Sequence, residues 1–134
     1  MANNVSDLWV AYTLPITTTA NLAGKSLVTA AGAAVTSAAN SVFGVLKVDT
    51  PSGDTADVKW GAVEVIATGT VTKGGKVEAL TASVYANING TSTATTSAGV
   101  QDLASGYPIG KALSGGVAND TVLVQLFLND AKTA

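Results

Sequence analysis

The sequence predicts a mainly β fold, a small single-domain β-barrel or sandwich-like fold with an extended amino-terminal arm. Hydrophobic residues make up 47% of the 134 residues but aromatic residues only 5%, so the apolar mass is alanine and valine, with much threonine beside it. Such small and β-branched side chains pack well in sheets. Short apolar and polar alternations separated by glycine-rich turns predict the same class. A chain of this length is expected to form one domain with a real core.

The clearest internal pattern is an echo between two segments that lie sixty-six positions apart. In each segment an apolar residue and a glycine open a strand, an aspartate and a threonine follow a polar turn, and a valine lies in a second strand. Two interpretations are open, a duplication within the chain or two hairpins of the same design. The matching residues are Phe43-Gly44 and Ile109-Gly110, Asp54-Thr55 and Asp120-Thr121, and Val58 and Val124.

Residues 1–22 differ from the rest and are expected to form an extended arm, followed by a β-rich domain at residues 23–130. The arm carries one of the two tryptophans and one of the three tyrosines. A proline ends its apolar run, because proline cannot donate to a sheet ladder. Such a segment is either an edge strand of its own domain or a strap onto a neighbouring molecule. The predicted interface residues are Trp9, Tyr12, Leu14 and Pro15.

Residues 22–40 are rich in alanine, and the sequence leaves their structure open. Alanine favours helix, whereas Gly32 and β-branched residues such as Val28 and Val35 oppose it. We expect a strand, a turn and a second strand, with helix as the alternative for residues 26–39.

The clearest β region runs from residue 42 to residue 80. Alternate residues from Ala56 to Trp60 are apolar, which gives a strand one apolar face. After a break at Gly61 the alternation resumes, with Glu64 between two valines. The segment Lys73-Gly74-Gly75-Lys76 predicts a turn, because paired glycines supply the positive φ that a tight turn requires.

The last third of the chain is predicted to hold a long loop and a buried strand. Residues 86–99 are low in complexity and rich in threonine, serine and alanine, so we expect an exposed loop. Residues 121–128 are expected to form the final strand. Val124 lies on one of its faces, and Leu123 and Phe127 lie on the other. Apolar residues on both faces predict a central or doubly covered strand.

The residue types that the chain lacks exclude most chemistry. Without histidine, cysteine or arginine it lacks the usual general base, the commonest metal ligand, a thiolate and a bidentate phosphate clamp. We therefore expect no enzyme activity, no cofactor and no metal. A net charge of -2 argues against a nucleic-acid partner. The chain has no apolar run of about eighteen residues, so we expect no membrane partner. It also has no signal-peptide pattern, so we expect synthesis in the cytoplasm.

Three weaker motifs favour structural roles. Gly24-Lys25-Ser26 resembles the end of a phosphate-binding loop, but Thr19 stands where the motif requires a glycine. Asp54 and Asp57 are expected on opposite faces, with Asp54 in a turn, and not as a metal pair. A carbohydrate platform is a further alternative, although packing is the stronger interpretation of its separated rings, Trp9, Trp60 and Tyr107.

The glycine-opened strands resemble the small capsid decoration (cement) proteins of tailed bacteriophages. In that family the typical ending is a glycine and short apolar strand, a turn rich in alanine and glycine, an aspartate, and a closing strand of valine and leucine. The resemblance covers about residues 22–128 and leaves the arm and residues 86–99 outside the pattern. It is carried by residues 41–46, the turn at Gly53-Asp54, and residues 69–77, 110–113 and 120–124.

The resemblance implies a non-enzymatic virion protein, located on the capsid exterior, that stabilises a phage head by bridging neighbouring major capsid subunits. Such proteins commonly act as homotrimers, and the four arm residues named above would form the capsid or inter-subunit interface. One alternative is a self-assembling shell, tail-tube or fibre subunit, which low charge and free β-edges would allow. A carbohydrate-binding β-module is a less favoured alternative.

Overall fold

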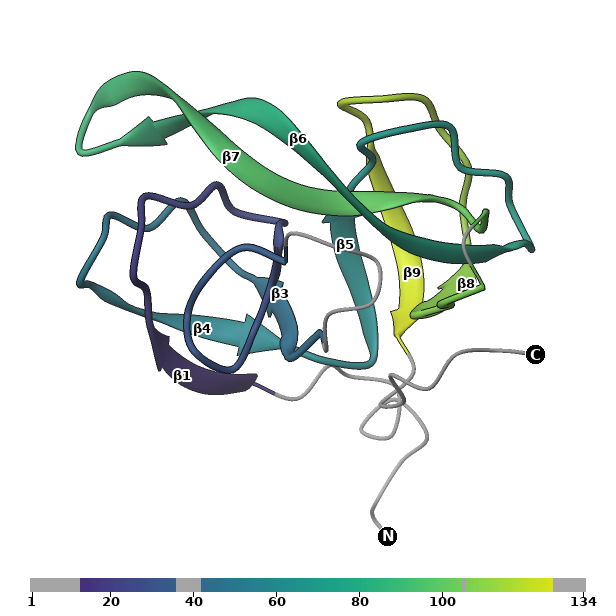
Figure 1. Ribbon diagram of the computed structural model, residues 1–134, viewed down its shortest axis with the longest axis horizontal. Helices are drawn as coiled ribbons and strands as arrows, with labels where there is room; N and C mark the ends of the chain where they lie inside the picture. The colour runs from purple at the N-terminus through teal and green to yellow at the C-terminus, as the bar shows by residue number, and fades with distance from the viewer. Residues whose placement is uncertain (1–12, 36–41, 105, 127–134) are drawn as a thin grey trace, which may run out of the picture.

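The computed structural model describes residues 13–35, 42–104 and 106–126, and this part of the chain forms nine β-strands and no helix (Figure 1). The strands lie in two antiparallel sheets, with the orders β1-β4-β3-β2 and β5-β9-β8-β6-β7. The prediction of a mainly β fold is confirmed. We call residues 13–59 the first lobe and residues 62–126 the second lobe. The strands are β1 (Thr13–Thr17), β2 (Leu27–Val28), β3 (Gly44–Leu46), β4 (Thr55–Lys59), β5 (Ala62–Ile66), β6 (Lys76–Ile88), β7 (Thr91–Asp102), β8 (Gly110–Ala112) and β9 (Thr121–Leu126).

The two lobes have the same strand arrangement. The order β1-β4-β3-β2 in the first lobe corresponds to β5-β9-β8-β6 in the second. The two segments of the sequence echo contain β3 and β4 in the first lobe, and β8 and β9 in the second. Leu46 pairs with Val58 in the first lobe, and their counterparts Ala112 and Val124 pair in the second. The echo therefore marks two hairpins with the same register.

Backbone hydrogen bonds outside the ladders repeat in the same way. The Lys47 N–H donates to the Asp57 carbonyl at 3.0 Å, and at the matching positions the Leu113 N–H donates to the Leu123 carbonyl at 2.7 Å. The turns before the last strand of each lobe also match. The Asp54 N–H donates to the Pro51 carbonyl, and the matching Asp120 N–H donates to the Val117 carbonyl. Likewise, the Gly53 N–H donates to the Thr18 carbonyl, and the matching Asn119 N–H donates to the Ala67 carbonyl.

The first two strands of each lobe also correspond: each residue of β1 and β2 matches the residue forty-nine positions later, in β5 and β6. Because the offset is sixty-six for the last two strands, the second lobe has seventeen additional residues in between. These residues lengthen β6 and supply β7, which has no counterpart among the described residues of the first lobe. The pair Thr17–Thr55 of the first lobe matches the pair Ile66–Thr121 of the second. In the same way, the pair Val28–Gly44 matches the pair Val77–Gly110.

The β6 and β7 strands form a long hairpin where the sequence was expected to give an exposed loop at residues 86–99. Asn89 and Gly90 make its two-residue turn, with φ angles of 53° and 78°. Positive φ at both central residues is typical of the type I′ turn that Asn-Gly favours. The loop prediction is wrong because it counted threonine as a loop residue, although threonine is a good strand former. The distal half of the hairpin lies over the first lobe (Figure 1).

The hydrophobic core joins the two lobes. Leu27, Val35 and Val45 of the first lobe are buried in the same cluster as the inward side chains of the second sheet. A smaller cluster around Leu46 and Val58 fills the inside of the first lobe. A third cluster lies beneath the distal hairpin and consists of Ala23, Val84, Ala86 and Ile88, with Ile66 packed against it.

The β9 strand is internal to its sheet but is covered on one face only. It lies between β5 and β8, and Val124 is fully buried. The expectation of a central strand is confirmed. The alternative of a doubly covered strand is wrong, because Leu123, on the opposite face, is 39% exposed. Phe127 lies outside the described residues.

The alanine-rich segment contains a short strand and a turn. After β2, the Gly32 N–H donates to the Thr29 carbonyl at 3.0 Å, and a bridge then joins Val28 to Ala34. The strand and turn that we expected are therefore present in the described part of this segment, where the Val28–Ala34 bridge follows the turn. Residues 36–41 lie outside the described residues.

Candidate functional site

Two of the four predicted interface residues lie in the described part of the chain. Leu14 and Pro15 belong to β1, and the Leu14 side chain is 41% exposed. Trp9 and Tyr12 lie outside the described residues. Among the described strands β1 pairs with β4 alone, so its other edge is open. The segment Thr13–Thr17 is thus an edge strand of the first sheet.

Pro15 interrupts the open edge of β1. Since the Asp57 carbonyl accepts the Lys47 N–H, the backbone of Asp57 faces β3. Pro15 is the register partner of Asp57, and therefore the backbone of Pro15 faces away from the sheet. Proline has no N–H, so an incoming strand would lose a ladder bond at this position. This edge is consequently a poor site for strand addition.

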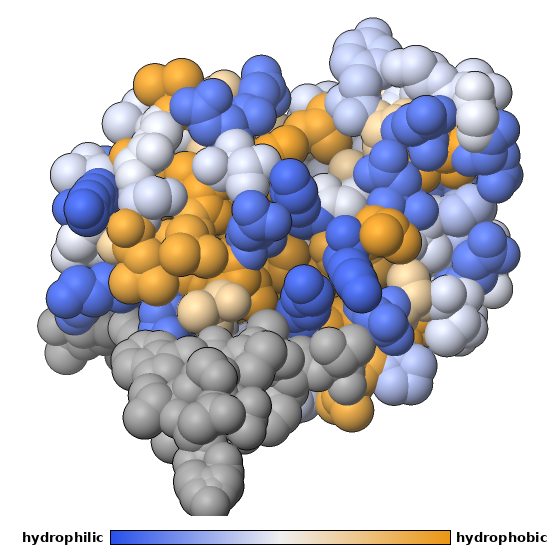
Figure 2. All heavy atoms as spheres, turned by 180° about the vertical axis from the view of Figure 1, so that it is seen from behind, coloured by the Kyte–Doolittle hydropathy of each residue, from blue (hydrophilic) through white to orange (hydrophobic). Residues whose placement is uncertain are grey.

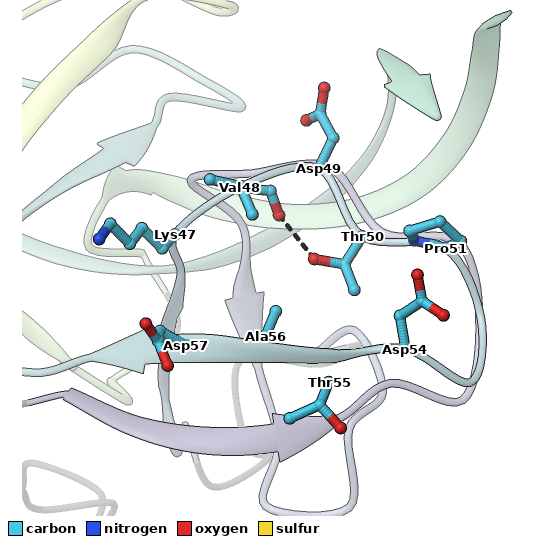
Figure 3. Close-up of a pocket in the computed structure, with 9 residues that line it drawn as sticks. All are labelled: Lys47, Val48, Asp49, Thr50, Pro51, Asp54, Thr55, Ala56 and Asp57. Carbon is cyan, nitrogen blue, oxygen red and sulfur yellow. Dashed lines mark hydrogen bonds between the residues drawn. The ribbon is translucent and has the colours of Figure 1, made fainter. Parts of the chain in front are cut away.

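A polar hollow of about 420 Å³ lies beside β4 in the first lobe (Figure 3). Asp54 and Asp57 are both among the residues that line it. Asp54 lies in a turn, as expected, and its N–H donates to the Pro51 carbonyl at 3.1 Å. Asp54 precedes the strand, so the alternation of strand side chains does not apply to it. No group of three acidic, histidine or cysteine residues in the described part of the chain is placed to hold a metal ion. The hollow is lined by Lys47, Val48, Asp49, Thr50, Pro51, Asp54, Thr55, Ala56 and Asp57.

The rim of this hollow has a structural carboxylate, Asp49. Its Oδ1 accepts the Gly24 N–H at 2.7 Å, and its Oδ2 accepts the Asn87 N–H at 3.0 Å. In Figure 3 the Asp49 side chain points away from β4. The neighbouring Thr50 hydroxyl donates to the Val48 carbonyl at 2.8 Å. These bonds hold the loop and join it to the distal hairpin.

The outer face of the second sheet carries an apolar patch, which we define as Leu113 and Leu123; the Leu113 N–H donates to the Leu123 carbonyl. The two leucines are each 39% exposed. Figure 2 shows that apolar side chains gather among polar ones on one face of the molecule. Exposed apolar side chains that cluster in this way indicate a contact surface. Sequence reasoning noted Leu123 but assigned it to the core.

A second exposed feature is Tyr85, on the outer face of the distal hairpin. Its ring is 77% exposed, while the neighbouring residues Val84 and Ala86 are buried. Its register partner across the hairpin is Ala94. An aromatic side chain among small ones is well suited to anchor a contact with a partner. The alternation around Tyr85 was the available sequence signal, and the expectation of a loop concealed it.

Of the three aromatic residues considered for a carbohydrate platform, two are described, and both are half-buried. Trp60 is half-buried and meets Phe43 edge-on, with ring centroids 5.2 Å apart and an interplanar angle of 73°. Tyr107 is also half-buried, and Trp9 lies outside the described residues. For Trp60 the packing interpretation is the better one.

Lys25 connects the two lobes. Its N–H donates to the Leu46 carbonyl at 2.7 Å, and its Nζ donates to the Thr121 hydroxyl at 3.1 Å. Gly24-Lys25-Ser26 is therefore a turn that leads into β2 and has no following helix. None of the described residues forms a helix long and apolar enough to cross a membrane.

The fold is thus a mainly β domain in which one four-stranded unit occurs twice, with several exposed apolar and aromatic side chains. A solved structure with a similar fold is the N base of head fiber gp8.5 in bacteriophage phi29. The TM-score is 0.56 at 13% sequence identity, and the match covers 91% of this chain and 98% of that chain. No protein-family model matches the sequence, and no curated protein matches it either.

Proposed function

We propose that this chain is a non-enzymatic structural protein of a phage virion, which lies on the outside of the head and binds the major capsid protein. The observation that carries the proposal is the similarity of fold to a phage head fibre base over 91% of this chain and 98% of that one. The resemblance of the glycine-opened strands to phage decoration proteins supports the same class of protein.

The described surface suits attachment through several modest contacts. Leu14 and Tyr85 are exposed on different elements, and the apolar patch lies on a third. Weak contacts become effective when the same site is repeated over a shell. In such interfaces a few aromatic or aliphatic anchors supply most of the binding free energy.

In this proposal Trp9, Tyr12, Leu14 and Pro15 form the contact with the capsid or with a sister subunit. The protein acts as a homotrimer that bridges neighbouring capsid subunits and stabilises the head. The trimer and the bridging role follow from the resemblance to decoration proteins.

The test is to mix the full chain with phage heads that lack it and to measure co-sedimentation, with imaging of the heads. We expect bound protein on the outer surface, no binding after removal of residues 1–12, and at least tenfold weaker binding for Trp9→Ala. The truncation ends at residue 12 because Thr13–Thr17 is a paired strand. Val48→Ala is the control, since Val48 is 54% exposed on another loop. Full binding by the truncated chain would overturn the role of the arm, and no binding by the intact chain would overturn the function.

A base or subunit of a head fibre is the second candidate, and the name of the phi29 neighbour favours it. Size-exclusion chromatography with light scattering separates the candidates. Monomers or small closed oligomers favour decoration, whereas polymers that lengthen with concentration favour a self-assembling fibre subunit.

A further inference from the structure

The outer face of the second sheet has an ordered arrangement of side chains. Register pairs share a face of a sheet, and so do residues two apart in a strand. Glu64 is paired with Leu123, and Leu113 bonds to Leu123 from the next strand. Lys111 is paired with Lys76. From the β5 edge across to β6, the face is therefore acidic at Glu64, apolar at the two leucines, and basic at Lys111 and Lys76.

The first lobe acts as an internal control for this face. The counterparts of Leu113 and Leu123 are Lys47 and Asp57, which occupy the same backbone positions and make the same hydrogen bond. A charged pair thus satisfies the fold at these positions. Folding alone does not require exposed leucines here, so their presence needs another reason.

The order of the charged residues across this face indicates that a second copy of the same face is a suitable partner. When two sheets pack face to face about a two-fold axis parallel to the strands, the β5 side of one lies over the β6 side of the other. For two copies of this face, Glu64 of each copy then approaches Lys111 and Lys76 of the other. The leucines of both copies meet in the centre. Apolar contact in the middle and opposite charges at both sides make the face complementary to itself.

We infer that two copies of this chain pair through the outer faces of their second sheets, with Leu113 and Leu123 at the centre and Glu64 opposite Lys111 and Lys76. This pairing concerns the free protein and goes beyond attachment to a head. The contact is closed, because each copy uses the same face, and it does not lead to polymers.

The experiment measures the mass of the intact chain over a wide concentration range by sedimentation equilibrium, without heads. The test variant combines Leu113→Lys with Leu123→Asp, which places the residues of the first lobe at the matching positions. We expect a monomer–dimer equilibrium for the natural chain and at least a tenfold higher Kd for this variant. Val48→Ala is the control, since Val48 is exposed on a loop of the first lobe, and it should leave the Kd unchanged. Circular dichroism checks that each variant folds.

Charge exchange gives a second readout that a folding defect does not imitate. Glu64→Lys and Lys111→Glu should each raise the Kd several-fold, and the double variant should restore it, because exchanged charges face each other again across the axis. A natural chain that stays monomeric, a dimer insensitive to the leucine changes, or a double charge variant as weak as the single ones would overturn the pairing.

The same measurements would also reveal whether the capsid or the amino-terminal arm covers this face instead of a second copy. If the natural chain is a monomer and the leucine variant loses binding to heads, the capsid covers this face. The pairing is then overturned while the proposed function stands. If removal of residues 1–12 converts a monomer to a dimer, the arm covers the face, and the pairing of the intact chain is overturned as well.

Discussion

At the scale of single residues, Asp49 holds together segments that are far apart in the sequence. Its two carboxylate oxygens accept backbone N–H groups of Gly24 and Asn87, at 2.7 and 3.0 Å. The first bond closes the loop before β2, and the second fastens the distal hairpin to the first lobe. A charged acceptor makes stronger hydrogen bonds than a neutral one, but the exposure of Asp49 reduces the gain.

Asp49→Ala should lower the free energy of unfolding by about 1–2 kcal/mol, because two backbone donors lose their acceptor. Asp57→Ala is the matched control, since its exposed carboxylate lies on the same hollow and its change should stay within about 0.5 kcal/mol. Urea denaturation followed by circular dichroism measures both. Equal losses for the two variants would show that the bonds of Asp49 do not stabilise the fold.

The sequence predicts the turn role of residues such as Asp54 better than the exposure of residues such as Leu123. A turn depends on local chemistry, and the aspartate and glycine at that position are sufficient to indicate it. Exposure depends on what lies against a face in space. Leucine on both faces of a strand normally indicates burial, so no local signal distinguishes a contact surface from a core. Trp9 and Tyr12 remain predictions.

At the scale of elements, the β6–β7 hairpin shows which local signals were sufficient and which were not. Asn89-Gly90 between segments rich in β-branched residues is a strong hairpin signal, and it was available in the sequence. The packing of this hairpin on Ala23 could not be predicted from the sequence, because Ala23 lies about sixty residues before the hairpin in the chain. The same holds for the burial of Leu27 and Val45 against the second sheet.

Gly90→Ala should destabilise the protein by about 1–2 kcal/mol, because an L-residue is strained at a φ of 78°. A Cβ at this position would meet no atom within 4 Å, so the effect isolates backbone strain from steric clash. Ser92→Ala, exposed at the same end of the hairpin, is the control and should change stability little. In the Gly90→Ala variant, hydrogen exchange should accelerate more at the distal β6 and β7 amides than elsewhere in the protein. Unchanged exchange there would contradict the role of the turn.

At the scale of the whole molecule, two copies of one strand arrangement make a single folding unit. Each lobe has the order of strands needed for its own sheet, yet the largest cluster draws on both lobes. The counterparts of Leu27 and Val45 in the second lobe are Lys76 and Lys111, which are exposed. The same positions thus pack against another sheet in one lobe and face outward in the other, so the stacking of lobes stops at two.

A shared core predicts that the lobes unfold together. Val45→Ala should lower the free energy of unfolding by about 2 kcal/mol, because Val45 is 2% exposed and its loss leaves a cavity between the lobes. Val48→Ala makes the same chemical change at a side chain that is 54% exposed, and it should have an effect below about 0.5 kcal/mol. Tryptophan fluorescence reports on Trp9 and on Trp60, which packs against Phe43 of the first lobe, and circular dichroism reports on both sheets. The two signals should give one coincident transition in the natural chain and in both variants. Separate transitions, or a Val45→Ala loss visible in one signal alone, would mean that each lobe folds on its own and that the shared cluster contributes little.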